Sequence, residues 1–122
     1  MIAALVVFVG GGIGAVLRYL ISKATLLLYS GQFPLATIIA NVFSCLIMVL
    51  FLYIFSYTKI NNPNFKLFFL LGICGGLSTF STFSLETVNL LKNGDYYWAL
   101  ANIVLSIVIC LGILIFFVKK TI

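Results

Sequence analysis

Four long apolar stretches constrain this chain more than any other feature. They cover about residues 2–20, 33–56, 67–91 and 96–118, and each reaches the roughly 20 residues that a helix needs to cross the hydrocarbon core of a bilayer. Hydrophobic residues make up 64% of the chain and charged residues 7%, whereas a soluble domain carries about 25% charged residues. We therefore expect an all-α integral membrane protein, with residues 1–122 forming a single domain of four transmembrane helices.

The charged residues argue against several classes of function. The net charge is +5, but the basic residues are scattered, and several flank the apolar stretches, where Lys and Arg normally contact lipid headgroups. We expect no nucleic-acid partner, because no basic patch with interleaved aromatic residues is present. The chain has no His, and its only carboxylates are Glu86 and Asp95, so no acid–base pair or activated nucleophile can be assembled. We expect a multi-pass protein of the cell membrane and not an enzyme.

The three cysteines, Cys45, Cys74 and Cys110, all lie within apolar stretches. No C-x-x-C pair is present, and without His a zinc site has few ligands. We interpret them as small, buried, apolar side chains.

The third apolar stretch is interrupted between Gly75 and Phe83. A pair of glycines is followed by five hydroxyl side chains: Ser78, Thr79, Ser81, Thr82 and Ser84. Irregular backbone at membrane depth is tolerated only where protein buries it or where it lines a cavity. The pattern predicts a broken helix, with the break at about 75–79, and such breaks indicate the ion or substrate site in small transporters. Beyond the break, Phe80, Phe83 and Glu86 recur every three residues, which predicts that they share one helix face.

Polar residues also recur inside the other stretches. Thr37, Asn41 and Ser44 are spaced to lie on one face of the second helix. Asn41 either forms an interhelical hydrogen bond or donates to a solute, and the sequence leaves both roles open. Asn102, Ser106 and Cys110 form a similar stripe on the fourth helix. Arg18 either reaches toward headgroups or lines a vestibule within the protein.

Two copies of the chain would form a pathway more easily than one, because four short helices make a thin unit. Two G-x-x-x-G motifs, Gly10–Gly14 and Gly72–Gly76, offer surfaces for close packing. Basic residues divide almost equally between the two membrane sides: Lys59, Lys66, Lys119 and Lys120 on one, and Arg18, Lys23 and Lys92 on the other. Because Lys and Arg bias normally sets orientation, this balance suits insertion in both orientations. We expect an antiparallel dimer.

The inventory of polar groups favours an anion as the solute. Asn41 and the hydroxyl groups donate hydrogen bonds, and Phe80 and Phe83 stand next to the break. The edge of a phenyl ring is electropositive, so ring edges can line an anion path without a fixed charge that would trap the ion. Conduction requires binding that is weak enough to allow release. The carbonyl groups of the break could hold a monovalent cation.

These motifs resemble the Fluc (CrcB-type) fluoride channel family over nearly the whole chain. The matching segments are Gly11–Tyr19, Asn41 and Gly72–Ser84. The resemblance implies a dual-topology antiparallel dimer with two fluoride pores and a central structural sodium ion held by backbone carbonyls. It implies the following site residues: Gly75 and Ser78 as the sodium ligands, Phe80 and Phe83 as pore-lining rings, Asn41 as a donor to fluoride, Ser81 and Thr82 in a polar track, and Ser106 and Cys110 on the pore side of the fourth helix.

Three positions depart from the family's pattern. Ala36 precedes Thr37, a further pore candidate on the Asn41 stripe, where the family usually has Gly. Ser78 stands where Thr is common, and Cys110 replaces a frequent Ser, which makes it a weaker hydrogen-bond donor.

The resulting prediction is a passive fluoride channel of the membrane that exports cytoplasmic fluoride, confers fluoride resistance and works as a homodimer. One alternative is a proton-coupled exporter similar to the small multidrug resistance family, although that family relies on a Glu in the first helix and none is present here. Another alternative is a non-conducting partner subunit of a heterodimeric fluoride channel.

Overall fold

The computed structural model describes residues 1–121, and every regular element within that range is helical. The elements are α1 (Ile2–Leu28), α2 (Leu35–Thr58), α3 (Pro63–Lys66), the π-helical segment η1 (Leu67–Cys74), α4 (Gly75–Leu77), α5 (Phe80–Lys92) and α6 (Tyr96–Thr121). Within the described range, four units are long and apolar enough to cross a membrane: α1, α2, the interrupted unit Pro63–Lys92, and α6. The prediction of an all-α membrane protein with a broken third helix is confirmed.

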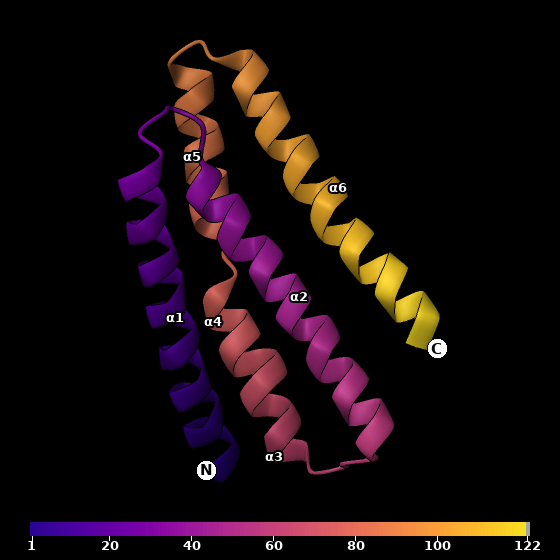
Figure 1. The fold of residues 1–122 in the computed structure, drawn as a ribbon. Coiled ribbons are helices and arrows are strands. Elements are labelled where there is room, and N and C mark those ends of the chain that lie inside the picture. Colours follow the sequence, from indigo (N-terminus) through magenta and orange to yellow (C-terminus); the bar gives the residue numbers. More distant parts are fainter. Residues whose placement is uncertain (122) are drawn as a thin grey trace.

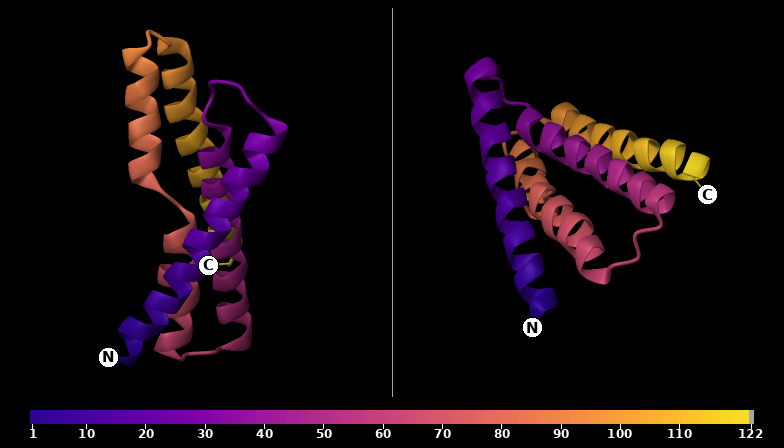
Figure 2. Two further views of the ribbon diagram at one scale, coloured as in Figure 1. Left: turned by 90° about the vertical axis from the view of Figure 1, so that its left-hand side faces the viewer. Right: turned by 60° about the horizontal axis from the view of Figure 1, so that its bottom comes forward.

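The helices pass between two ends of the molecule (Figure 1). The two chain ends and the turn between α2 and α3 lie toward one end, and the α1–α2 and α5–α6 connections lie at the other. α1 packs mainly against η1 and α4, whereas α6 packs against α2 and α5. The views in Figure 2 show α5 offset from the lower half of the third unit, with a stretched connection between them. Because of this offset, the candidate site lies about halfway between the two ends of the molecule.

Two helix ends differ from the sequence prediction. α1 continues to Leu28, past the expected end at about residue 20 and into the connection expected before the second apolar stretch. Neither Gly nor Pro occurs in residues 21–28, and the long side chain of Lys23 can reach headgroups while its backbone stays helical. Helix therefore persists until Ser30 and Gly31. The second turn is also shorter than the interval 57–66 between the second and third apolar stretches, because the Asn62 side chain caps α3 by accepting from the Asn64 N–H at 3.0 Å.

The break in the third unit is confined to two residues. Ser78 (φ −78°, ψ 156°) and Thr79 (φ −149°, ψ 121°) are extended, while Gly75–Leu77 stay helical. The break was expected over about 75–79. It is narrower because the Ser78 N–H still donates to the Cys74 carbonyl at 3.0 Å, as in a continuous helix.

The two G-x-x-x-G motifs pack against each other inside one chain. A Cβ on Gly10 would lie 2.6 Å from the Phe68 carbonyl oxygen, and a Cβ on Gly72 would lie 2.9 Å from the Gly10 Cα. Gly14 and Gly76 are equally tight against the facing backbone. These glycines join α1 to η1 and α4, so the expectation that they supply the surface between two copies is wrong.

A single methyl group on this glycine seam should destabilise the fold. Gly14→Ala places a Cβ 2.8 Å from the Leu77 amide nitrogen, and overpacking of this kind costs about 1–3 kcal/mol. Gly12→Ala is the matched control, because a Cβ there meets nothing within 4 Å. We expect a lower thermal unfolding midpoint in detergent for Gly14→Ala than for Gly12→Ala. Equal midpoints would contradict the close approach of α1 to α4.

Candidate functional site

The side chain of Asn41 holds the break in the third helix. Its Oδ1 accepts from the Thr79 N–H at 2.8 Å, and its Nδ2 donates to the Thr79 carbonyl at 3.4 Å. Thr79 is buried, and an unpaired backbone group buried away from water costs about as much as a lost hydrogen bond. α2 therefore satisfies the backbone that the break exposes. The sequence left two roles open for Asn41, and the structure shows the interhelical hydrogen bond. These two bonds leave the second N–H of Nδ2 unused.

Side-chain hydroxyls complete the break on both sides. The Thr79 Oγ1 accepts from the Thr82 N–H at 3.2 Å and so caps the start of α5, as Thr does at many helix starts. On the other side, the Cys74 carbonyl accepts from the hydroxyls of Ser44, at 2.8 Å, and Ser78, at 2.9 Å. Ser81 Oγ lies 3.4 Å from the Thr79 Oγ1. The run of hydroxyl residues thus serves first to hold the interrupted backbone.

The carbonyl groups of residues 75–78 lose their helical donors at the break. In a continuous helix the Thr79 N–H would bond the Gly75 carbonyl, and the Thr82 N–H would bond that of Ser78. Here these amides donate to Asn41 Oδ1 and Thr79 Oγ1 instead. Gly75 is exposed, and a Cβ there would meet nothing within 4 Å. Carbonyl oxygens suit hard cations, so the donor set fits a small hard cation at this surface.

A groove of about 400 Å³ lies beside the break, between α2, α5 and α6. Its lining residues include five of the predicted pore residues: Asn41, Phe80, Phe83, Ser106 and Cys110. The rings of Phe80 and Phe83 are 5.7 Å apart and tilted by 38°, and Phe80 is 80% exposed. Among the described residues, no charged side chain lines the groove. An apolar wall with a few hydrogen-bonding groups can pass a small solute without trapping it.

A buried polar chain fixes α6 against α5 behind the groove. Asn102 is fully buried, and its Nδ2 donates to the Thr87 hydroxyl at 3.0 Å. Thr87 in turn donates to the Phe83 carbonyl at 2.8 Å. The Ser106 hydroxyl donates to Asn102 Oδ1 over 3.5 Å, a long contact from which a hydroxyl can rotate toward the groove. The polar stripe on α6 therefore serves packing as well as the groove.

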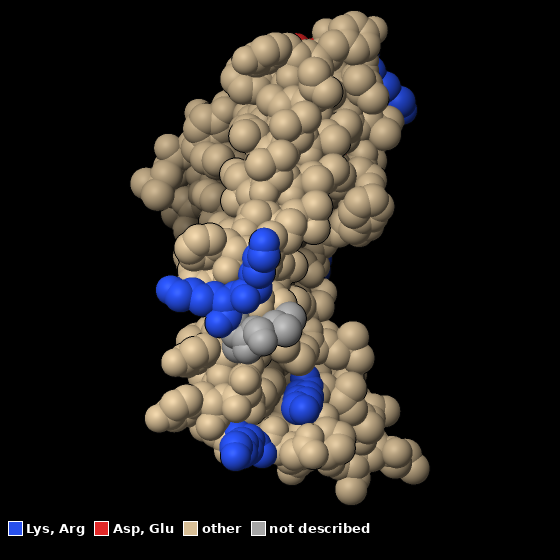
Figure 3. Space-filling model, turned by 90° about the vertical axis from the view of Figure 1, so that its right-hand side faces the viewer, with Lys and Arg blue, Asp and Glu red and all other residues tan. Residues whose placement is uncertain are grey.

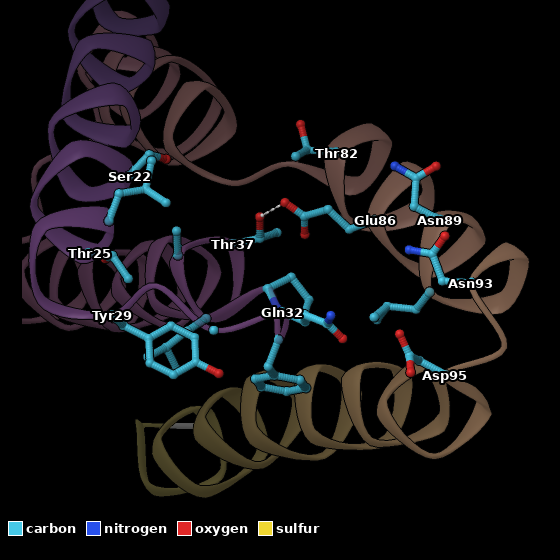
Figure 4. Close-up of a pocket in the computed structure, with 17 residues that line it drawn as sticks. Ser22, Thr25, Tyr29, Gln32, Thr37, Thr82, Glu86, Asn89, Asn93 and Asp95 are labelled. Atoms are coloured by element: carbon cyan, nitrogen blue, oxygen red, sulfur yellow. Dashed lines mark hydrogen bonds between the residues drawn. The ribbon is translucent and has the colours of Figure 1, made fainter.

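Both carboxylates of the chain line a second cavity of about 400 Å³ near the α1–α2 and α5–α6 connections. In Figure 4, Glu86 points toward Thr37, and Gln32, Asn89, Asn93 and Asp95 surround the same space. Thr37 Oγ1 donates to Glu86 Oε1 at 2.7 Å. Oε2 is buried, and nothing within residues 1–121 donates to it. The spacing predicted that Glu86 shares a helix face with Phe80 and Phe83, but Glu86 does not line the groove. Two steps of three residues fall short of two helical turns of 3.6 residues and rotate Glu86 away from Phe80.

A third cavity, of about 320 Å³, shares lining residues with both of these regions. Arg18 lines it together with Thr37, Thr79 and Thr82. Thr37 and Thr82 also line the Glu86 cavity, and Thr79 also lines the groove. Arg18 thus lies beside polar residues of α2 and of the break, and its role at a vestibule stays a prediction. The predicted site residues are distributed over three cavities rather than gathered in one cluster.

Uncharged residues cover most of the face that carries α6, while Lys and Arg side chains lie across its middle and in its lower half (Figure 3). The residues that line the groove are all uncharged, so the groove itself suits contact with lipid or with another apolar protein face.

Three contributors to the site escaped the sequence prediction. Thr79 caps α5 and lines two of the cavities. The sequence signal for the cap was a threonine directly before the point where the helix begins again. Cys45 lines the groove one turn after Asn41, and that spacing was its signal. Thr87 holds Asn102, and no pattern in the sequence pairs them. Cys45 and Cys110 are also partly exposed and not buried as expected, whereas Cys74 is buried.

Comparison with known proteins gives a consistent result. Residues 5–118 match the family described as CrcB-like protein, Camphor Resistance (CrcB). The chain is 47% identical over 103 residues to the fluoride-specific ion channel FluC of Serratia proteamaculans, covering 84% of this chain and 80% of that protein. It is 40% identical over 109 residues to the protein of that name from Coxiella burnetii, covering 88% of each chain. The namesake from Clostridium perfringens is 41% identical over 107 residues, covering 88% of this chain and 84% of that protein.

Removing the Asn41 amide should destabilise the chain strongly. Asn41→Ala leaves the N–H and carbonyl of Thr79 without their partners, and each buried group left unsatisfied costs about 1–3 kcal/mol. Ser44→Ala is the matched control on the same helix face, because the Cys74 carbonyl keeps its two bonds from Ser78. Urea unfolding in detergent should show a clearly larger loss for Asn41→Ala. A loss no larger than that of Ser44→Ala would contradict the role of Asn41 at the break.

Proposed function

The chain belongs to the CrcB-like protein family, and we propose that it is a passive fluoride channel of the membrane. Its membership in this family agrees with the expectation of a transport protein and not an enzyme. The observation that carries the proposal is the uncharged groove beside the helix break, where Phe80 and Phe83 face Asn41, Ser106 and Cys110. The relatives at 40–47% identity are named fluoride-specific ion channels, which supports fluoride as the solute.

The chemistry of the groove suits a small anion. Asn41, Ser106 and the rotatable hydroxyls can donate hydrogen bonds, and phenyl ring edges carry positive partial charge. None of these groups is ionised, so the ion is bound weakly enough to leave again. Chloride is larger and accepts weaker hydrogen bonds, so it gains less from closely spaced donors. Selectivity for fluoride then follows from narrowness and donor density.

The proposed path begins in the cavity around Glu86 and Thr37. It continues past Arg18, Thr37 and Thr82 and reaches the groove at Thr79. Arg18 provides positive charge beside the entrance, which raises the local concentration of anions. The bond from Thr37 to Glu86 engages one oxygen of the carboxylate near the path.

No energy source besides the membrane potential is needed. Fluoride is the anion of a weak acid, so it enters a cell as HF and is trapped when HF ionises inside. A channel lets the inside-negative potential drive the anion out. The groove has no carboxylate to couple proton movement, which favours this reading over a proton-coupled exporter.

We further propose that the working unit is an antiparallel homodimer around a sodium ion. Polar backbone at membrane depth must be covered by protein, and Gly75, with a carbonyl that lost its helical donor, is exposed in the single chain. A second copy would cover this surface and the exposed Phe80. The carbonyls of Gly75 and Ser78 would hold the ion, and its positive charge would offset carbonyl dipoles that converge from two copies.

Fluoride efflux from liposomes that contain this chain alone tests the proposal. We expect rapid loss of fluoride and little loss of chloride. Phe80→Ile should slow fluoride efflux at least about tenfold, equal to about 1.4 kcal/mol in the barrier, because a ring edge is removed from the groove.

Phe8→Ile is the matched control, since Phe8 on α1 is 77% exposed and Phe80 is 80% exposed. Equal slowing by both variants would indicate a general packing effect. A folded dimer that passes no fluoride would overturn the proposal for this chain alone and would favour a partner chain.

A further inference from the structure

Two cysteine side chains meet in the wall of the groove. Cys45 on α2 and Cys110 on α6 both line it, and their side chains lie close enough to interact. Each follows a polar groove residue by four positions, Asn41 on α2 and Ser106 on α6, and so lies one turn farther along the same helix face. Both are partly exposed. A small solute in the groove can therefore reach two thiols at once.

We propose that Cys45 and Cys110 form a binding site for a soft metal cation that takes two thiolate ligands, such as mercury(II). Thiolate sulfur selects soft cations. Within residues 1–121, no group of three or more His, Cys, Asp or Glu side chains could hold a metal, so a four-coordinate zinc site is not available. Two facing thiols match the linear, two-coordinate geometry that mercury(II) prefers.

Charge balance also favours a divalent soft cation. Each thiol releases one proton to water and forms one sulfur–mercury bond, so Hg²⁺ and two R–SH groups give Hg(SR)₂ and two H⁺. The product is neutral, and no oxidant or reductant takes part. Neutrality matters here because the groove is lined by uncharged and mostly apolar side chains, where an isolated charge is costly.

A cation bound there would lie beside Phe80 and Phe83, which line the same groove. It would fill the space that the proposed function assigns to the passing anion. Binding of the metal does not depend on that function, but block of transport by the metal rests on it. The two consequences can therefore be tested separately.

Intact-mass measurement tests the binding. The full chain in detergent and chloride-free buffer receives one equivalent of mercury(II) nitrate. We expect each chain to gain one mercury atom and lose two hydrogens, the mark of a bridge between two thiols. No uptake, or loss of a single hydrogen, would overturn the proposal.

Two variants with equal numbers of thiols identify the pair. Cys74→Ala keeps Cys45 and Cys110 and should form the bridge, whereas Cys45→Ala keeps Cys74 and Cys110 and should not. Cys110→Ala repeats the test from α6, and size-exclusion chromatography verifies that each variant is folded. Bridging of equal extent in Cys74→Ala and Cys45→Ala would overturn the assignment.

Fluoride efflux, measured for each variant before and after mercury(II), tests the block. Efflux by the unmodified chain and by Cys74→Ala should fall at least about tenfold and recover with a dithiol, while Cys45→Ala should keep its own rate. Bridging without any fall in efflux would leave the metal site in place and would contradict a path through the groove.

Discussion

The pair of hydrogen bonds between the Asn41 amide and the Thr79 backbone is the interaction on which the site depends. Two extended residues interrupt a helix at membrane depth, where water cannot satisfy the exposed groups. Asn41 supplies one acceptor and one donor to the same residue, so the backbone groups of the extended Thr79 are both hydrogen-bonded. The Thr79 N–H that donates to Asn41 is the group that would donate to the Gly75 carbonyl in a continuous helix. The same bond therefore maintains the break and leaves a carbonyl without its helical donor.

The glycine seam sets where this break lies relative to the rest of the molecule. Gly10 and Gly14 allow the backbone of α1 to contact that of η1 and α4, which leaves the lower half of the third unit no room to shift. α5, beyond the break, packs instead against α6 through Asn102 and Thr87. The two halves of the interrupted helix thus belong to different packing units. The break therefore lies where the third unit passes from packing against α1 to packing against α6.

Features that follow from local composition could be predicted from the sequence. Contacts between side chains on facing helices could not. Four spans follow from the length of the apolar stretches, and the break near Gly75 follows from glycines and hydroxyls that no lipid-facing helix would carry. The partner of Asn41 did not follow, because an amide on α2 carries no mark of which backbone it meets. The π-helical turns of Leu67–Cys74 have no pattern that distinguishes them from α-helix. Cys45 was expected to be a buried apolar residue, because nothing in its sequence context shows that α6 brings Cys110 to the same groove.

The distribution of charge along the three cavities agrees with the physics of a channel for a strongly hydrated anion. Glu86 and Asp95 line the cavity where the proposed path begins, and Arg18 lines the neighbouring one. The groove beyond Thr79 contains no charged lining residue among those described. An isolated ion in an apolar interior costs far more than a hydrogen-bonded one, so donors must replace water step by step along the path. A positively charged residue in the groove would lower the cost of entry for the anion, but it would also hold the anion there. Arg18 attracts the anion toward the path, and the uncharged donors in the groove replace its water and still permit release.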